Sequence, residues 1–383
     1  MDYFLTEDQQ ELRQLARKVA KEKVYPVAAH YDQTGEFPWD MVKLFAELDF
    51  FRLFIDFDHG GMGGGVTELS LITEELSRAC GGIALAVAGT ALGAFPIILF
   101  GSEEQKQKFL PKIADGEHLA GFCLTEPSAG SDAGAVKTRA ERKGDKYILN
   151  GKKHFITNGG VAQIYTVIAL TNPAKGSRGA SAFVVPADAP GLSIGKKEDK
   201  MGIRASATSE VIFEDCEIPA DYLLGREGGG FAVAMKTLDR TRPGVAAQAL
   251  GIAQGALDAA VAYAKEREQF GQSVISFQAI QVMLADMATQ IEAARALIYS
   301  TAKMIDSGSK NFSKESAMCK VYASDVAMKV TTDAVQIFGG YGYMKDYPAE
   351  KYMRDAKITQ IYEGTNQIQR NVIAQKLIRE IAK

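Results

Sequence analysis

The first third of the chain places its hydrophobic residues at the spacing of an α-helix. Thr6 and Gln9 form a capping-box pattern, and apolar residues then recur every three or four positions. A glycine-rich segment, residues 60–65, separates this helix from a second apolar helix near 69–76. Residues 83–100 contain no charged side chain, so we expect them to lie deep in the core.

The period of the pattern changes near residue 120. Residues 146–156 predict a β-hairpin, because Asn150–Gly151 is a sequence that a tight type I′ turn prefers. Short β-rich runs separated by proline and glycine follow at Tyr165–Leu170, Ala182–Val185 and Glu210–Phe213. We therefore expect a compact β domain in the middle of the chain.

Helical spacing returns after the glycines at 228–230 and persists to the C-terminus. Apolar residues between Ile280 and Ile298 mark a long amphipathic helix. A chain of 383 residues is long enough for two or three domains. We predict an α+β fold with an N-terminal helical domain (1–119), a middle β-barrel or β-sandwich domain (120–230) and a C-terminal four-helix-bundle domain (231–383).

The composition points away from nucleic-acid and membrane partners. Hydrophobic residues make up 46% of the chain, and the formal net charge of -3 provides no basic surface for nucleic acid. The four cysteines are widely scattered, which argues against a disulfide framework and fits a reducing compartment. The N-terminus is acidic where a signal peptide is basic, and no stretch is expected to approach the ~18 uncharged apolar residues of a membrane span. We expect a cytoplasmic protein that binds neither nucleic acid nor membrane.

The common nucleotide, metal and hydrolase motifs are missing from the sequence. There is no G-x-G-x-x-G fingerprint and no P-loop, and no G-x-S-x-G elbow. The four histidines have no HExxH-type partner, so we expect no metal site. On these grounds alone, a non-catalytic helical scaffold is an open interpretation.

Six segments in sequence order favour an enzyme instead. They are LTEPSAGSD at 124–132, FITN at 155–158, DRTRP at 239–243, REQFG at 267–271, QIFGG at 336–340 and IYEGTNQ at 361–367. Together they resemble the acyl-CoA dehydrogenase family over essentially the whole chain, in particular its short-chain, butyryl-CoA dehydrogenase-like bacterial members. The resemblance implies an FAD-dependent enzyme that takes a proton and a hydride from adjacent carbons of an acyl-CoA thioester.

By this resemblance, two segments of the β domain contact the flavin ring. The Thr125 hydroxyl and its loop backbone bind the ring, Phe155 packs on it where most relatives have Trp, and Thr157 meets flavin N5. Arg267 resembles the arginine that reaches a neighbouring subunit's flavin pyrophosphate, and its planar, permanently charged fork suits phosphate. The expected cofactor-binding residues are Phe122, Leu124, Thr125, Gly130, Ser131, Phe155, Ile156, Thr157, Arg267, Phe270, Phe277, Gln278, Gln336, Ile337, Gly339, Gly340, Thr365 and Gln367.

The resemblance also identifies Glu363 as the catalytic base. Its carboxylate would take the α-proton, because desolvation by the acyl chain raises its basicity. The Glu363 N–H and a ribityl hydroxyl of the flavin would stabilise the thioester oxygen. Relatives that act on branched substrates carry the base at the position of Thr241, and threonine cannot serve there. The expected substrate-binding residues are Thr90, Ser131, Leu238, Asp239, Arg242, Tyr362, Glu363 and Gly364.

The helix that matches residues 84–95 is expected to line the end of the acyl pocket. Its small residues suit a compact acyl group, from butyryl to hexanoyl or a six-membered alicyclic ring. Ala84 stands where glutaryl-type relatives have arginine, so a buried terminal carboxylate would lack a partner. The resemblance further implies a homotetramer that passes electrons to an electron-transfer flavoprotein. An enoyl-CoA reductase or electron-bifurcating relative of the same fold is an alternative that the sequence leaves open.

Overall fold

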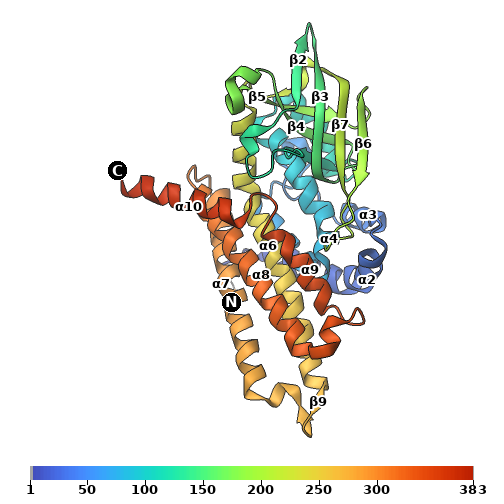
Figure 1. Cartoon of the computed structure of the whole chain (residues 1–383), viewed down its shortest axis with the longest axis vertical. Coiled ribbons are helices and arrows are strands. Elements are labelled where there is room, and N and C mark those ends of the chain that lie inside the picture. The colour runs from blue at the N-terminus through green and yellow to red at the C-terminus, as the bar shows by residue number, and fades with distance from the viewer. Residues whose placement is uncertain (1–2, 383) are drawn as a thin grey trace.

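The computed structural model describes residues 3–382, and its elements run in the order helices, small β domain, helices (Figure 1). The predicted α+β architecture is confirmed. The α-helices are α1 (Glu7–Val19), α2 (Tyr25–Thr34), α3 (Trp39–Glu47), α4 (Val66–Phe100), α5 (Glu103–Ala114), α6 (Gly230–Glu266), α7 (Gln278–Asp306), α8 (Ser313–Phe338), α9 (Ala349–Thr359) and α10 (Asn366–Ile381). The strands are β1 (Ala120–Cys123), β2 (Arg139–Lys143), β3 (Lys146–Thr157), β4 (Ile164–Leu170), β5 (Ala180–Pro186), β6 (Leu192–Lys197), β7 (Thr208–Pro219), β8 (Leu223–Leu224), β9 (Glu268–Gln269) and β10 (Gln272–Ser273).

Helix α4 forms the centre of the N-terminal region. The capping box before α1 is confirmed, since the Thr6 hydroxyl accepts from the Gln9 N–H at 3.2 Å. The helical backbone of α4 is broken once, at Cys80, which has φ -159° and ψ 110°. Most of the uncharged segment 83–100 is buried, as predicted. Helix α4 packs against both α6 and strand β1, so it contacts the β domain and the C-terminal helices alike.

The first eight strands form one mixed sheet in the order β6-β7-β3-β2-β4-β5-β8, with β1 added beside β4. Strands β1 and β4 are parallel, and Ala120 lies opposite Ile164. The polypeptide that leaves β1 at Cys123 therefore emerges next to α4, because β1 also packs on that helix. This arrangement positions the segment 124–132 between the sheet and the long helices.

The predicted turn at Asn150–Gly151 is wrong. Strand β3 runs straight through both residues, and the hairpin turn lies earlier, at Gly144 with φ +65°. Gly151 instead marks a bulge where the register between β3 and β7 shifts. A Cβ atom at Gly151 would lie 2.4 Å from Oγ1 of Thr138, so the glycine allows two backbone segments to approach closely. Position 151 does require glycine, but the reason is its close packing against Thr138 and not a turn.

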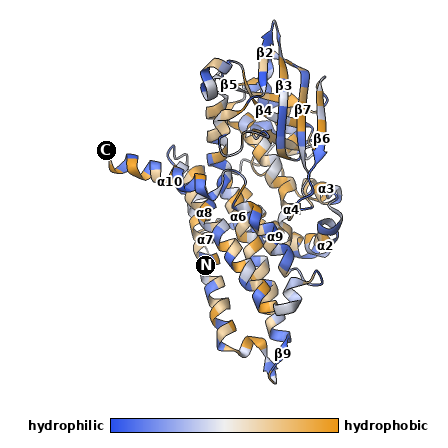
Figure 2. Ribbon diagram, viewed as in Figure 1, coloured by the Kyte–Doolittle hydropathy of each residue, from blue (hydrophilic) through white to orange (hydrophobic). Residues whose placement is uncertain are grey.

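Helix α6 extends from the β domain to the opposite end of the molecule, where β9 lies, and α7 and α8 pack along its lower part (Figure 1). Helix α8 packs against α6, α7, α9 and α10. Figure 2 shows the tip around β9 as hydrophilic, whereas hydrophobic residues run along the packed helices. Helix α10 projects sideways from this body, with the C-terminus at its end (Figure 1).

We expected no stretch as long and apolar as a membrane span, and the lengths and compositions of two helices contradict this expectation. Helices α4 and α6 are each long and apolar enough to cross a membrane. In both helices, however, 72% of the apolar window is buried inside the protein. Their hydrophobicity is therefore accounted for by the packing of the core.

Candidate active site

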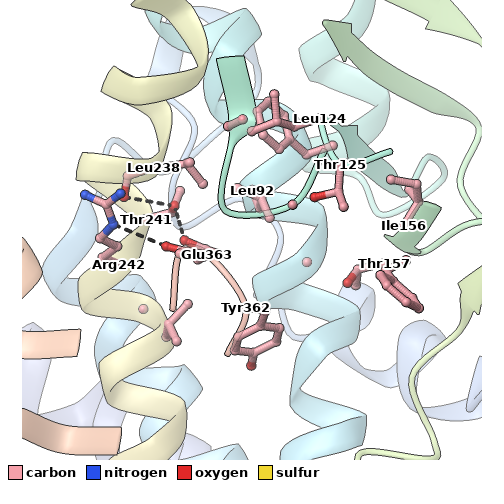
Figure 3. A pocket seen from close by; sticks show the side chains of 18 of the residues that line it. Leu92, Leu124, Thr125, Ile156, Thr157, Leu238, Thr241, Arg242, Tyr362 and Glu363 are labelled. Atoms are coloured by element: carbon pink, nitrogen blue, oxygen red, sulfur yellow. Dashed lines mark hydrogen bonds between the residues drawn. The ribbon is translucent and has the colours of Figure 1, made fainter. Parts of the chain in front are cut away.

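A cavity of about 430 Å³ lies where α4, α6, the segment after β1 and the segment after α9 meet (Figure 3). Thirteen of the residues predicted for the cofactor or the substrate line it: Phe122, Leu124, Thr125, Gly130, Ser131, Phe155, Ile156, Thr157, Leu238, Arg242, Tyr362, Glu363 and Gly364. They come from segments far apart in the chain, and the fold brings them together around one space.

Glu363 lies in the short connection between α9 and α10. Its backbone adopts φ +52°, a left-handed conformation that is uncommon outside glycine and directs the side chain into the cavity. Oε2 of Glu363 accepts a hydrogen bond of 2.7 Å from the Thr241 hydroxyl, and its carbonyl accepts one of 3.4 Å from Nε of Arg242 (Figure 3). Burial raises the pKa of the Glu363 carboxyl above its usual value, although the Thr241 hydroxyl and the cations of Arg242 and Lys320 oppose the shift.

Asp239 supports the site from behind the wall of the cavity. Its carboxylate pairs with Nη1 of Arg242 at 2.5 Å, and only Arg242 of the two lines the cavity. Asp239 does not line the cavity itself, and its carboxylate contacts Arg242 instead. Its predicted role in substrate binding would therefore act through the arginine.

A buried ion pair holds the loop that follows β1. Nζ of Lys153 donates to the carbonyl of Leu124 at 2.9 Å and to Oε1 of Glu126 at 2.8 Å, and the lysine is fully buried. The second carboxylate oxygen of Glu126 accepts the Lys137 N–H at 2.6 Å. Burial acts to raise the pKa of Glu126, but the charge and hydrogen bond of Lys153 outweigh it, so the pKa lies below its usual value. These bonds fix the loop that presents the Thr125 hydroxyl to the cavity.

The segment at the end of β3 supplies the facing wall. Phe155 is 60% exposed and has φ +57°, while Ile156 is buried and Thr157 faces the cavity (Figure 3). Asn158, directly after them, is fully buried and donates to the carbonyl of Ala120 at 3.0 Å. It also donates to the hydroxyl of Thr90 at 3.2 Å. Thr90 is therefore turned into the protein core and does not line the cavity, so its predicted contact with substrate stays a prediction.

The deep end of the cavity is lined by residues of α6 that the sequence motifs did not single out, and by residues of α4 within the segment 84–95 that was expected to line the acyl pocket. Helix α6 contributes Val245 and Gln248, one and two turns beyond Thr241, and the Tyr362 hydroxyl donates to Oε1 of Gln248. Helix α4 contributes Leu85, Ala88, Gly89 and Leu92. The spacing of three or four residues from Thr241 could have identified the α6 residues, because such positions share one helix face.

A second group of predicted residues lies away from this cavity. Arg267, Ile337, Gly339 and Gly340 line a separate hollow of about 570 Å³ at the far end of the C-terminal helices, where the Arg267 guanidinium lies 5.7 Å from the centre of the Tyr341 ring. Six further residues do not line the first cavity within one chain: Phe270, Phe277, Gln278, Gln336, Thr365 and Gln367. Phe270 is 94% exposed, and Thr365 caps α10 through the Ile368 N–H. In residues 3–382, no cluster of three or more His, Cys, Asp or Glu side chains could hold a metal ion.

Comparison with known proteins identifies the family. Three domain models of acyl-CoA dehydrogenases match the chain: the N-terminal domain at residues 6–117, the middle domain at 121–216 and the C-terminal domain at 228–378. The short-chain specific acyl-CoA dehydrogenase of Clostridium acetobutylicum is 49% identical over 99% of this chain and 100% of its own length.

Two solved structures agree with this match. The butyryl-CoA dehydrogenase of Megasphaera elsdenii has a TM-score of 0.96 and 48% identity, covering 99% of this chain and 100% of the other. A chain from the structure of the electron transferring flavoprotein of Acidaminococcus fermentans has a TM-score of 0.97 and 54% identity, with the same coverage. The chain belongs to the acyl-CoA dehydrogenase family, flavin-dependent oxidoreductases, and is of the butyryl-CoA dehydrogenase type.

Proposed function

We propose that the protein is an FAD-dependent acyl-CoA dehydrogenase that converts a short or compact acyl-CoA into the 2-enoyl-CoA, with Glu363 as the base. The observation that carries this proposal is the Glu363 carboxylate, which faces a cavity shared with Thr125, Thr157 and the Leu124 loop. A carboxylate whose pKa is raised by burial is a stronger base than one in water, as proton abstraction next to a thioester requires.

The chain's own groups fit the proton-transfer half of the reaction. Glu363 would take the proton from the α-carbon, while Thr241 orients the carboxylate through its 2.7 Å hydrogen bond. Within the described residues, the backbone N–H of Glu363 donates no hydrogen bond, so it is free to bind the thioester oxygen. Such a donor stabilises the negative charge that develops on this oxygen as the proton leaves.

The walls of the first cavity fit a flavin ring. They combine apolar side chains with polar ones, among them the hydroxyls of Thr125 and Thr157, which suits a planar ring with polar edges. When bound, FAD would supply the acceptor for the hydride from the β-carbon. The hollow around Arg267 fits a phosphate group, but it belongs to a different part of the chain. We therefore infer that a second copy brings its Arg267 to the cofactor, within a homotetramer.

The lining of the deep end supports a compact acyl group. Ala88 and Gly89 add little bulk to the wall that α4 forms, and Gly89 lies against Thr157, whereas Gln248 and Tyr362 add hydrogen-bonded polar atoms to the same cavity. Butyryl-CoA to hexanoyl-CoA, or an alicyclic acyl-CoA, fits this combination. The similarity to a chain in the electron transferring flavoprotein structure supports a flavoprotein as electron acceptor.

The same similarity favours a second candidate function. The flavoprotein of Acidaminococcus fermentans is associated with flavin-based electron bifurcation, so an enzyme running as an enoyl-CoA reductase in such a complex is the alternative. The two functions share the site and differ in the direction in which electrons flow.

The visible spectrum and anaerobic reduction of the purified protein test the proposal. We expect a yellow protein that releases FAD, not FMN, on denaturation. Its flavin absorbance should bleach on anaerobic addition of butyryl-CoA. Bleaching by none of a panel of acyl-CoAs, together with rapid reoxidation of the reduced protein by crotonyl-CoA, would favour the reductase. A colourless protein that cannot be reconstituted with FAD would contradict both.

A further inference from the structure

Lys320 is a fully buried lysine on α8, directly behind the connection that carries Glu363. Its Nζ donates to the carbonyl of Gly364 at 2.8 Å and to Oδ1 of Asn366 at 2.9 Å. Among the described residues it forms no salt bridge, since both of its hydrogen-bond acceptors are neutral. A buried lysine without a paired carboxylate is costly, so its position calls for a functional explanation.

The segment that Lys320 binds is strained. Glu363 has φ +52° and Gly364 has φ +92°, two consecutive residues in the left-handed region. A non-glycine residue holds this conformation only where surrounding contacts impose it. Nε2 of Gln369 donates to the carbonyls of both residues, at 3.2 and 3.1 Å. Lys320 supplies the additional bond to Gly364 from a different helix.

Asn366 connects the same lysine to a rigid support. Its Nδ2 donates to Oγ of Ser324 at 2.8 Å and to Oδ1 of Asp325 at 2.8 Å, one turn further along α8. The hydroxyl of Ser324 in turn donates to the Lys320 carbonyl at 2.6 Å. Lys320 and Asn366 thereby tie the connection after α9 to α8 at two points, Gly364 and Asn366.

We propose that Lys320 is a positioning residue for the base: it holds the Glu363–Gly364 peptide in its left-handed conformation and, in its protonated form, places a positive charge behind the Glu363 carboxylate. This inference rests on the proposed role of Glu363 in proton abstraction. It assigns to Lys320 no contact with substrate, because Lys320 does not line the cavity.

The charges around Lys320 agree with this role. Glu363 faces it from the connection after α9, Arg242 from α6 and Asp325 from its own helix, and Arg242 is itself paired with Asp239. Burial lowers the pKa of Lys320 to about 7, with Glu363 acting in the opposite direction. In return, the ammonium of Lys320 lowers the pKa of Glu363.

The test compares three variants of the FAD-loaded protein. Lys320→Met keeps an unbranched side chain but removes the donors and the charge, while Lys320→Gln keeps a neutral donor. Lys329→Met is the matched control, because Lys329 lies on the same helix, is exposed and pairs with Asp333. Two readouts are needed: amide hydrogen exchange of the 360–368 segment, and rapid-mixing flavin reduction by butyryl-CoA between pH 6 and 9.

For Lys320→Met we expect exchange of the 360–368 segment to accelerate by about ten-fold or more, as loss of the hydrogen bonds to Gly364 and Asn366 predicts. Flavin reduction should slow by about 10- to 100-fold, the effect of a misplaced reacting group, and its pH profile should shift to higher pH. FAD content should stay at the wild-type level. Lys320→Gln should recover part of the rate without recovering the pH profile, and Lys329→Met should match wild type in both readouts.

Wild-type exchange and a wild-type pH profile in Lys320→Met would overturn the inference, as would faster exchange without any change in reduction. If Lys320→Met does not fold, the Lys320→Gln variant decides instead: a pH profile of flavin reduction identical to that of wild type would also overturn the inference. Failure of the wild-type flavin to be reduced by any acyl-CoA would instead refute the proposed function. The exchange measurement requires no substrate, so it still decides whether Lys320 fixes the connection.

Discussion

The hydroxyl of Thr241 lies 2.7 Å from Oε2 of Glu363, although the two residues are separated by 122 positions in the chain. Thr241 occupies the position at which relatives for branched substrates are expected to carry their base. The contact shows that both positions reach the same point of the cavity, one from α6 and the other from the connection between α9 and α10 (Figure 3). Here threonine serves as a hydrogen-bond donor to the carboxylate that the connection supplies.

Replacing Thr241 with valine should raise the pKa of Glu363, because the hydroxyl hydrogen bond favours the ionised carboxylate. The pH at which substrate-driven flavin reduction reaches half its maximum should move upward by about one unit, the equivalent of one such bond. Thr237→Val is a matched control one turn earlier on α6, since the buried Thr237 hydroxyl has no hydrogen-bond partner in the described chain. Identical pH profiles for the two variants would show that the Thr241 bond does not tune the base.

Replacing Lys153 with methionine should destabilise the fold by about 3 kcal/mol, because it leaves the buried carboxylate of Glu126 without its cation. The neighbouring Lys152 provides the control. It pairs with Glu210 at 2.7 Å but is 43% exposed, so Lys152→Met should cost about 1 kcal/mol or less. Urea unfolding of both variants measures the difference. Equal losses of stability would mean that the Glu126–Lys153 pair does not anchor the loop after β1.

Replacing Arg267 with alanine should weaken FAD retention more than it weakens the fold. Arg267 is exposed in one chain and lies far from the first cavity, so its expected target is the cofactor of a second copy. Lys265→Ala, an exposed change near the same end of α6, should leave FAD bound. The measurement is the flavin-to-protein ratio after gel filtration, with light scattering for assembly. A wild-type monomer that retains FAD fully would refute the shared site.

The stability of wild type relative to Lys320→Met should increase with pH between 7 and 9. Burial lowers the pKa of Lys320 to about 7 in the folded protein, while the unfolded chain keeps the usual value of 10.5. Over this interval the unfolded state binds more protons, so the free energy of unfolding rises with pH. The rise should be on the order of 2 kcal/mol over two pH units. Groups common to both proteins cancel in the difference, and a difference that is constant with pH would contradict the shifted pKa.

Sequence patterns predicted the order of the elements because helical and strand periods differ strongly on either side of residue 120. They misplaced the hairpin, since Gly151 is required by the proximity of Thr138, which no local pattern reveals. The membrane expectation failed for a similar reason. An uncharged run such as 83–100 has the same composition in a protein core and in a lipid bilayer.

The candidate site was predictable where short motifs carry the side chains. Thr125, Thr157 and Glu363 belong to such motifs, and the fold brings them around one cavity. Thr90 does not line this cavity, and helix phase alone does not reveal that its hydroxyl bonds Asn158. Lys320 could not be found from the sequence, because its importance depends on a contact with Gly364 across 44 positions.

Removal of the α-proton by Glu363 is tested most directly by Glu363→Gln. Glutamine keeps the shape and polarity of the side chain while removing the base. The variant should fold, bind FAD and bind acyl-CoA, and dithionite should reduce its flavin normally. Reduction by butyryl-CoA in a rapid-mixing experiment should slow by a factor on the order of 10³ or more. A rate within a few-fold of wild type would contradict the account and require a different base.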